Sequence, residues 1–390
     1  MKYDGKLGTF EFDEREFKLE GGLSGRCLKY IGKESSGNKI EIPEGILSIE
    51  FMFENRTDLV IPPVIPDGVK YCEGAFSGCT HLKEAPEIPE GVVDCRGMFE
   101  DCISLVTPAE LPESVIITAG MYHGCKALIE TSNFPENVFA DEMYEGCQSL
   151  ASSTEMPDSV QSINNIYKGC SSLRYVPSLP DGLKSLDGTF ANCESLEKAP
   201  VIPEGVLSCK GTFSGCVTLL EPASVPEGVK NCTEMYRGCD SLTKIPALPE
   251  SVQKANRAFE GCKSAQKIGA FPEHFEESER LFEGCTGVQS TYGTTDQDEL
   301  RIILRYQQHL KSVGKDIYPM TKGKNQGDGH EQYKHNNGNG KKNNFRKGEV
   351  QYERVPESIA ASTPQKTTEI SSIPRNGRYS EDDEETYRVS

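Results

Sequence analysis

A cysteine recurs at an almost fixed interval along most of this chain. Every step between successive members is 23 residues, except for one step of 22 residues that ends at Cys147. The ten positions are Cys79, Cys102, Cys125, Cys147, Cys170, Cys193, Cys216, Cys239, Cys262 and Cys285. A repeat of this length is typical of a solenoid, in which one coil cannot bury its apolar side alone and must stack on its neighbours. The period therefore predicts one stack of coils rather than several globular domains.

Each repeat also carries an aromatic residue and a set of apolar side chains. The copy from Leu82 to Leu105 has apolar residues that recur with neither the period of a strand nor that of a helix. We therefore expect a closed coil whose side chains turn inward at successive corners. Eleven copies span residues 45–290, with the aromatic position filled by Phe53, Phe76, Phe99, Tyr122, Tyr144, Tyr167, Phe190, Phe213, Tyr236, Phe259 and Phe282. In the first copy Arg56 replaces the cysteine, as expected of an end coil.

Proline marks the corners of the coil. A turn proline is followed by an acidic residue and often by glycine, as in Ile88–Gly91, and a second proline such as Pro86 lies just upstream in many copies. Because proline donates no hydrogen bond to a ladder, the strands are expected to be very short. In the shortened copy, between Val138 and Cys147, we expect a lost aliphatic position and a local kink or bulge.

These motifs resemble the BspA-type leucine-rich repeat. That family carries Ile-Pro-x-x-Val, Ala-Phe-x-Gly-Cys and a closing Ser-Leu, which stand here at Ile88–Val92, Ala75–Cys79 and Ser104–Leu105. The resemblance covers residues 28–288. It implies a leucine-rich repeat solenoid of short parallel β-strands joined by loops and short helical turns. It also implies a protein that works in binding, often as a surface or adhesive protein of bacteria and protists.

Both ends of the repeat region are expected to be covered. Residues 1–44 contain short alternating runs broken by turn residues, which predict an N-terminal β cap. After the last coil, Thr295–Asp298 resembles a capping box and predicts a C-terminal helix over residues 295–314. Residues 321–390 contain no Leu, Cys, Met or Trp, and a disordered tail is therefore expected over residues 320–390.

The net charge of −18 restricts the partners. An acidic body repels the phosphate backbone, so nucleic acid is not expected to bind, although residues 322–347 form a basic tract. No apolar run reaches the roughly 18 residues that span a bilayer, and no membrane partner is expected. Residues 1–8 lack the apolar core of a secretory signal, so the expected location is the cytoplasm, with non-classical export to the surface left open.

The fifteen cysteines suggest packing more than chemistry. One position filled ten times is expected to hold a small, slightly polar side chain at a corner of the core. A second set alternates at its position with Ile49, Ile163, Leu186 and Ala255, and consists of Cys72, Cys95, Cys209 and Cys232. Cys-x-x-Cys is absent, and fifteen cysteines without a secretory signal indicate a reducing compartment. We therefore expect no metal site and no cofactor.

The sequence also lacks a catalytic signature. It contains no His-Glu-x-x-His, no Gly-x-Ser-x-Gly and no Walker-type loop. A cysteine–histidine pair would need His81 or His123, each two residues from a cysteine of the row and present in only two copies. No catalytic or cofactor-binding residue is therefore assigned, and the protein is expected not to be an enzyme.

The most specific surface feature is an acidic residue that follows the turn proline in all eleven copies. We call this set the acidic ridge: Glu44, Asp67, Glu90, Glu113, Glu136, Asp158, Asp181, Glu204, Glu227, Glu250 and Glu273. One interpretation is favourable turn chemistry on a solvated edge. The other is a line of carboxylates that attracts a basic partner or divalent cations. In a third variant, the basic tract 322–347 of the same chain folds back along the ridge.

These observations favour a non-enzymatic, cytoplasmic protein-interaction scaffold that presents an extended acidic binding surface. The partner is expected to be a protein, with a basic one favoured. Variable residues beside the short strand are the expected contacts, namely Lys83, Glu84, Arg174, Tyr175, Glu197, Lys198, Thr243 and Lys244. The alternative is a surface-exposed adhesin or structural component of the BspA-like class.

Overall fold

The computed structural model describes residues 1–22, 25–32, 40–272 and 275–290 of the 390-residue chain, all within one compact unit. Four strands lie at its N-terminal end: β1 (Lys2–Gly5), β2 (Gly8–Glu11), β3 (Phe17–Gly22) and β4 (Gly25–Tyr30). β1 pairs with β2, and β3 pairs with β4, in both cases antiparallel. This end of the chain therefore has a strand arrangement different from that of the coils.

Backbone hydrogen bonds and one ring contact join these strands to the first coil. Gly8 forms an antiparallel bridge with Ile46. The Tyr30 N–H donates to the Met52 carbonyl at 3.0 Å, and the Tyr30 ring lies 5.5 Å from that of Phe53. The apolar interior of the coils therefore continues under the N-terminal strands.

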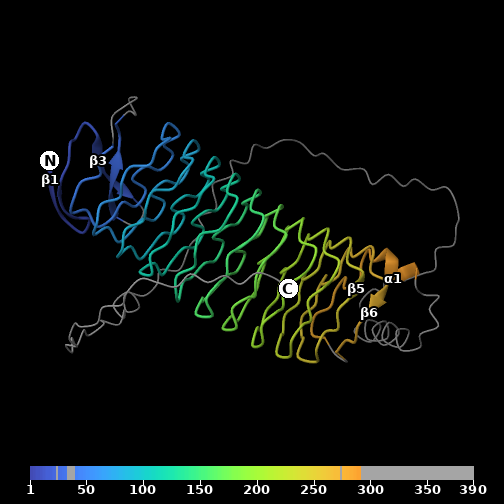
Figure 1. The fold of residues 1–390 in the computed structure, drawn as a ribbon. Helices are drawn as coiled ribbons and strands as arrows, with labels where there is room; N and C mark the ends of the chain where they lie inside the picture. Colours follow the sequence, from blue (N-terminus) through green and yellow to red (C-terminus); the bar gives the residue numbers. More distant parts are fainter. Residues whose placement is uncertain (23–24, 33–39, 273–274, 291–390) are drawn as a thin grey trace, which may run out of the picture. The chain divides into compact units, whose positions relative to one another are not determined.

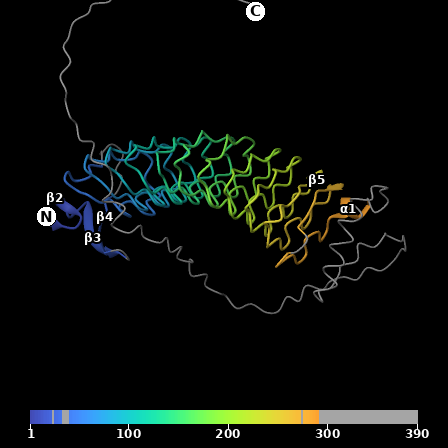
Figure 2. The ribbon, with the colours of Figure 1, turned by 90° about the horizontal axis from the view of Figure 1, so that it is seen from below.

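Two ladders of parallel backbone bridges join successive coils. The first ladder follows the leucine of each repeat and contains Glu84–Thr107, Ser152–Tyr175, Lys198–Glu221 and the strands β5 (Lys244–Ile245) and β6 (Lys267–Ile268). A further bridge, Glu41–Val64, lies three residues nearer the turn proline. The second ladder follows the turn valine and links Ser48, Tyr71, Asp94, Ile117, Phe139 and Ser162, then Ser185, Ser208, Asn231, Lys254 and Glu277. Figures 1 and 2 show the coils following one another in sequence order in two perpendicular views. Most bridges join single residues, which confirms the expectation of very short strands.

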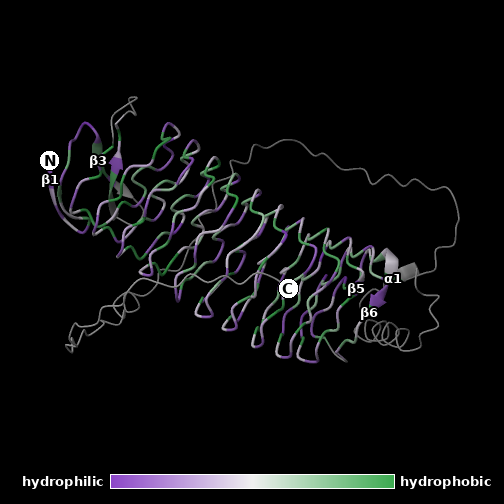
Figure 3. Cartoon of the chain, viewed as in Figure 1, coloured by the Kyte–Doolittle hydropathy of each residue, from purple (hydrophilic) through white to green (hydrophobic). Residues whose placement is uncertain are grey.

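A row of stacked rings runs through the interior of the coils. From Phe53 to Phe282, consecutive ring centroids lie 5.2–5.9 Å apart with interplanar angles of 4–18°. All of these rings except Phe282 are fully buried. Figure 3 shows hydrophobic and hydrophilic segments alternating along each coil. Each ring therefore packs against the ring of the next coil, in an arrangement that aromatic pairs favour.

After Phe53, which has Ile40 thirteen positions earlier, the identity of the ring is related to the residue at or near that position. In five coils that residue is proline and the ring is phenylalanine: Pro63 and Phe76, Pro86 and Phe99, Pro177 and Phe190, Pro200 and Phe213, Pro246 and Phe259. In two coils it is alanine, and its N–H donates to a tyrosine hydroxyl: Ala109 to Tyr122 at 3.0 Å, and Ala223 to Tyr236 at 3.1 Å. Proline has no N–H to satisfy, so a phenylalanine ring suffices there.

Two more tyrosines follow the same rule with slightly shifted partners. The Tyr144 hydroxyl accepts the Ser132 N–H at 3.0 Å, and the Tyr167 hydroxyl bonds the hydroxyl of Ser153. In the last coil the corresponding residue is Gly269, whose N–H donates to another backbone carbonyl at 3.0 Å, and the ring is a phenylalanine. Three tyrosines, Tyr122, Tyr144 and Tyr236, therefore accept a buried backbone N–H that has no other partner among the described residues, whereas the Ser153 hydroxyl that contacts Tyr167 also donates to the Thr154 carbonyl.

The 22-residue step is absorbed in a turn and not in the core. Only one residue separates Val138 from Ala140, where other copies have two. Ala140 is fully buried at the apolar position, so the expected loss of that position is wrong. Phe139 keeps its place in the second ladder, and the rings of Tyr122 and Tyr144 stack 5.5 Å apart. The shortened turn leaves both the ladder and the ring row continuous.

Several expectations about the C-terminal part lie outside the described residues. A short helix, α1 (Thr286–Ser290), follows the last cysteine of the row. The predicted helix over residues 295–314, the predicted tail over residues 320–390 and the ridge member Glu273 fall outside the described ranges. The domain boundaries at residues 44, 45 and 290 stay predictions.

Candidate functional site

The acidic ridge lies at the turn between the two ladders. The acidic side chains follow a turn proline, and in several coils the next residue is a glycine in the left-handed region, such as Gly91 at φ 93° and Gly228 at φ 97°. All ten members within the described residues are exposed: Glu44, Asp67, Glu90, Glu113, Glu136, Asp158, Asp181, Glu204, Glu227 and Glu250. The turn chemistry therefore brings one carboxylate per coil to the surface, and the stacking of coils places these carboxylates in register.

Some ridge carboxylates also bind the backbone of the next coil. The Glu136 N–H donates to the Glu113 carboxylate at 3.2 Å, and the Asp181 N–H donates to the Asp158 carboxylate at 3.4 Å. The Ser159 hydroxyl donates to the Glu136 carboxylate. These contacts support the interpretation of the ridge as turn chemistry in the middle coils. They also limit the movement of those side chains, because each is held against its neighbour.

The ridge is poor in neutralising partners. Among the described residues, no Lys, Arg or His lies within ion-pair distance of the nine carboxylates from Glu44 to Glu227. With roughly 4.8 Å between paired backbones, neighbouring carboxylates repel each other mildly in water. The ridge thus forms a line of negative charge open to an external cation.

The variable residues predicted as contacts lie along the first ladder. Glu84, Tyr175, Lys198 and Lys244 are all ladder residues, and their neighbours Lys83, Arg174, Glu197 and Thr243 precede them. All eight are exposed, and Tyr175 is 63% exposed. The structure places these positions together on one ladder, separate from the turn that carries the ridge.

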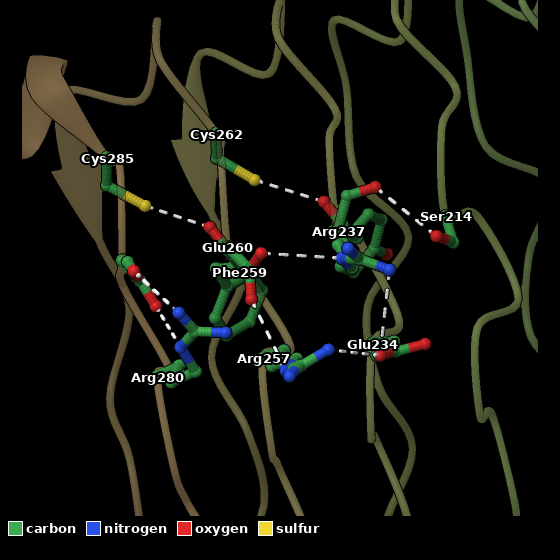
Figure 4. A network of polar contacts seen from close by, with 11 residues as sticks. Ser214, Glu234, Arg237, Arg257, Phe259, Glu260, Cys262, Arg280 and Cys285 are labelled. Carbon is green, nitrogen blue, oxygen red and sulfur yellow. Dashed lines mark hydrogen bonds and ion pairs between the residues drawn. The ribbon is translucent and has the colours of Figure 1, made fainter. Parts of the chain in front are cut away.

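All fifteen cysteines are free and buried, which confirms that both sets belong to the core. The structure adds a contact that the sequence did not predict. Each thiol of the row donates to the carbonyl oxygen of the aromatic residue one coil earlier, with Sγ–O distances of 2.9–3.2 Å. Two of these bonds, from Cys262 and Cys285, are visible in Figure 4. The thiols therefore hold adjacent coils in register, beyond filling space.

Burial makes the thiols from Cys79 to Cys262 weak acids. It raises the pKa of Cys79 to about 12 and that of Cys216 to about 12, and it also raises the pKa of the thiols in the tyrosine coils, such as Cys147. The thiolate is the nucleophile and the metal ligand, so a neutral buried thiol supplies neither function near pH 7. His81 contacts the Thr57 carbonyl and His123 lies 3.7 Å from Glu100, so neither histidine contacts a thiol of the row in the described contacts.

Arg56 replaces the missing thiol at the N-terminal end of the row. Its guanidinium donates to the Tyr30 carbonyl at 3.2 Å and lies 4.7 Å from the centroid of the Tyr30 ring. Tyr30 stands 23 residues before Phe53 and acts as the ring of the preceding layer. This offset was readable in the sequence and could have identified the partner of Arg56.

Ion pairs cross the outer side of the last coils, as Figure 4 shows. Glu234 pairs with Arg257 at 3.5 Å, and Glu260 pairs with both Arg257 and Arg237 at 3.5 Å. The Ser214 hydroxyl donates to the Arg237 carbonyl at 3.4 Å. These charges neutralise one another, in contrast to those of the ridge.

A pocket of about 510 Å³ lies between the N-terminal strands and the first two coils. We call it the end pocket; it is lined by side chains from residues 11–17, from residues 40–44, and by Val64 and Pro66. Glu44 of the acidic ridge is one of its lining residues. Sequence reasoning missed this pocket, because it depends on how distant segments pack and no local motif marks it.

The described residues hold neither a metal-ligand cluster nor a membrane-spanning helix. No three His, Cys, Asp or Glu side chains in these ranges gather closely enough to hold a metal ion. No helix there has the length and apolar character needed to cross a membrane. The ridge and the end pocket are therefore the main candidate sites on this part of the chain.

Comparison with known proteins points to one repeat family. A family profile described as "BspA type Leucine rich repeat region (6 copies)" matches residues 50–174, 137–264 and 209–300. A search of curated proteins finds no match.

Three solved structures are similar to this chain. A leucine-rich repeat protein from Bacteroides ovatus is 21% identical over 71% of this chain and 93% of its own, with a TM-score of 0.39. A leucine rich cell surface protein from Faecalibacterium prausnitzii is 20% identical over 70% and 94%, with a TM-score of 0.34. A leucine rich repeat protein from T. pallidum is 24% identical over 54% and 90%, with a TM-score of 0.36.

Proposed function

Because this chain belongs to the BspA-type leucine-rich repeat family, we propose that it is a non-enzymatic protein-interaction scaffold whose solenoid presents the acidic ridge to a basic partner. The observation that carries this proposal is the row of exposed carboxylates from Glu44 to Glu227, none of which has an ion-pair partner among the described residues. A row of like charges on a repeating backbone raises the local concentration of a cationic ligand and accelerates its association.

The geometry of the ridge suits an extended polypeptide. Its carboxylates recur once per coil, at a spacing of roughly 4.8 Å, and side chains on one face of an extended chain recur at a similar scale of roughly 7 Å. Lysine and arginine carry their charge on long flexible stems, so an exact match of the two spacings is not required. The variable residues of the first ladder, such as Tyr175 and Lys198, would then discriminate among basic partners.

A cytoplasmic setting is part of the proposal. All fifteen thiols are free and buried, and Cys72 and Cys95 occupy the same position in consecutive coils. Free thiols so close together persist most readily in a reducing compartment. The alternative is a surface adhesin. Protease treatment of intact cells distinguishes the two, because digestion of the protein on intact cells would contradict the cytoplasmic setting.

The test uses the full chain and an octalysine peptide as probe. A triple variant, Glu90→Gln with Glu204→Gln and Glu227→Gln, removes three ridge charges whose side chains make no hydrogen bond or ion pair among the described residues. We expect its Kd to rise about tenfold at low salt, and the salt dependence of binding to become shallower.

The matched control removes three exposed carboxylates away from the ridge, by Glu130→Gln, Glu194→Gln and Glu276→Gln. It has the same net charge as the ridge variant, so any difference between them reports position. An equal loss of affinity in both variants would contradict a role for the ridge. Absence of any octalysine binding by the unchanged protein would overturn the proposed function.

A further inference from the structure

We propose that the end pocket binds a terminal pair of residues of the basic partner, one cationic and one apolar or aromatic. This inference rests on the proposed function, and it adds where the partner begins and which side chains it carries there. Two independent features coincide in the pocket: a half-open hollow whose buried lining side chains are apolar and form its floor, and a rim of exposed carboxylates. The volume of about 510 Å³ falls within the range of about 300–1,000 Å³ that is usual for ligand pockets.

The rim of the end pocket is acidic. Its carboxylates are Glu11, Asp13, Glu16, Glu41 and Glu44, and no Lys or Arg is among the residues that line it. Arg15 pairs with Asp13 at 2.6 Å and offsets one of these charges. This contact lowers the pKa of Asp13 to about 2, so the carboxylate remains ionised at neutral pH. Four further carboxylates therefore face an incoming cation.

The floor of the end pocket is apolar. Phe12, Phe17 and Ile42 are buried and line it, while Val64 stands at the rim and is 64% exposed. A small inorganic cation would leave this apolar surface in contact with water. A lysine or arginine stem next to an apolar side chain covers the surface and carries its charge to the rim.

The backbone holds the two walls of the end pocket in place. Gly8 at the start of β2 packs on the first turn so closely that a Cβ atom there would lie 2.3 Å from the Gly45 carbonyl oxygen. On the other side, a parallel bridge links Glu41 to Val64. The pocket is therefore preformed, and ligand binding does not have to order its walls.

The end pocket is also continuous with the acidic ridge. Glu44 lines the pocket and is the first ridge member, and Asp67 follows it one coil later. A basic segment that lies along the ridge therefore reaches the pocket at the end of the ridge that holds Glu44. Because the pocket and the ridge are continuous, we expect the pocket to bind one end of the same polypeptide that lies along the ridge.

The absence of tryptophan from this chain makes a direct test possible. The probe is a peptide of Trp-Arg followed by six lysines, and its tryptophan emission reports only on the peptide. In the presence of the full-length protein we expect a blue shift, because the indole leaves water for the apolar floor. The double variant Glu16→Gln with Glu41→Gln should remove the blue shift and raise Kd about tenfold.

A second variant and a matched control separate the possible outcomes. Val64→Arg, which places a cation at the rim, should also remove the blue shift, and its folding is checked by circular dichroism. Glu204→Gln with Glu227→Gln removes the same number of charges far along the ridge, and should weaken binding but keep the blue shift. Salt-dependent binding without a blue shift in the unchanged protein would overturn the pocket inference and leave the proposed function standing. No binding of the peptide would overturn both.

Discussion

Two kinds of coil share one stack, and they differ at a single buried contact. In the coils of Tyr122 and Tyr236, the ring hydroxyl accepts a backbone N–H from the facing segment. In the coils of Phe99 and Phe213, proline occupies the facing position and the ring has no hydroxyl. Ring spacing is nevertheless similar around both kinds, at 5.3–5.6 Å.

This difference shows that two separate requirements determine which residue occupies the ring position. Stacking requires an aromatic side chain, which either residue supplies. The choice between phenylalanine and tyrosine follows the hydrogen-bond inventory of the facing backbone, because a buried N–H without an acceptor is costly. The two kinds of coil are therefore alternative solutions to one packing problem, and each requires both of its partners.

The largest expected effect concerns what both kinds of coil share, the thiol row. Burial raises the pKa of Cys79 in a phenylalanine coil and of Cys147 in a tyrosine coil above the ordinary value of 9.0. Below pH 9 these thiols are protonated in both the folded and the unfolded chain, so their contribution to stability is constant. Above it the unfolded chain ionises first, and each pH unit removes about 1.4 kcal/mol of stability per thiol.

Burial raises the pKa of nine thiols of the row, from Cys79 to Cys262, and together they remove on the order of 10 kcal/mol by about pH 10, which is comparable to the whole stability of a typical protein. We therefore expect cooperative loss of structure between about pH 9 and 11, measured by circular dichroism together with thiolate and tyrosinate absorbance. Burial also raises the pKa of Tyr144, so tyrosine coils should add to the loss at the upper end of this range. Thiolate that forms gradually in a chain that stays folded would contradict this prediction.

The next largest effect concerns the hydrogen bond that distinguishes the tyrosine coils from the phenylalanine coils. Tyr236→Phe removes the acceptor of the Ala223 N–H, and should cost about 1–3 kcal/mol because a buried donor is left unsatisfied. Adding Ala223→Pro removes the donor as well and converts this coil to the other kind. We expect the double variant to recover most of the loss, as measured by urea unfolding of all four chains in a double-mutant cycle.

The matched control makes the opposite change in a phenylalanine coil. Phe213→Tyr adds a hydroxyl where Pro200 offers no N–H, and it should destabilise the chain. Strictly additive effects of the two changes in the Tyr236 coil would show that ring and facing residue act independently. The coupling free energy between the ring and its facing residue would then be zero, and the two kinds of coil would not differ in this contribution to stability.

The sequence predicted much of this molecule, because its period is strict. The buried cysteines, the ring row, the short strands and the exposure of the described ridge residues all follow from one repeating pattern. The pairing of Tyr236 with Ala223 was also present in the sequence, but its interpretation required knowing that positions 13 apart face each other. The thiol-to-carbonyl bonds join different coils, and no pattern within one repeat indicates them.

The ends of the stack were harder to predict. The end pocket forms where residues 11–17 pack against residues 40–44, and neither segment contains a motif for that contact. The effect of the short step before Cys147 was misjudged, because a sequence does not show whether a missing residue is lost from the turn or from the core. Ala140 shows that the turn absorbed it.

The smallest expected effect lies on the surface where the two kinds of coil adjoin. Arg257, in the coil of Phe259, pairs with Glu234 in the coil of Tyr236 and with Glu260, each at 3.5 Å. Glu260 keeps Arg237 as a second partner when Arg257 is lost. Arg257→Met should therefore cost less than about 1 kcal/mol, and the cost should shrink further at high salt.

Urea unfolding of Arg257→Met at low and high sodium chloride measures this cost, with Lys263→Met as a control that breaks one exposed pair, to Asp240 at 2.7 Å. Both variants remove one cation, so a common change reports net charge, and only an excess for Arg257→Met reports the network. A salt-independent loss as large as that of Tyr236→Phe would mean that charges on the outer side join the coils as strongly as the ring contact does. The energetic difference between the two kinds of coil would then come from their surface ion pairs and not from the contact between each ring and its facing backbone segment.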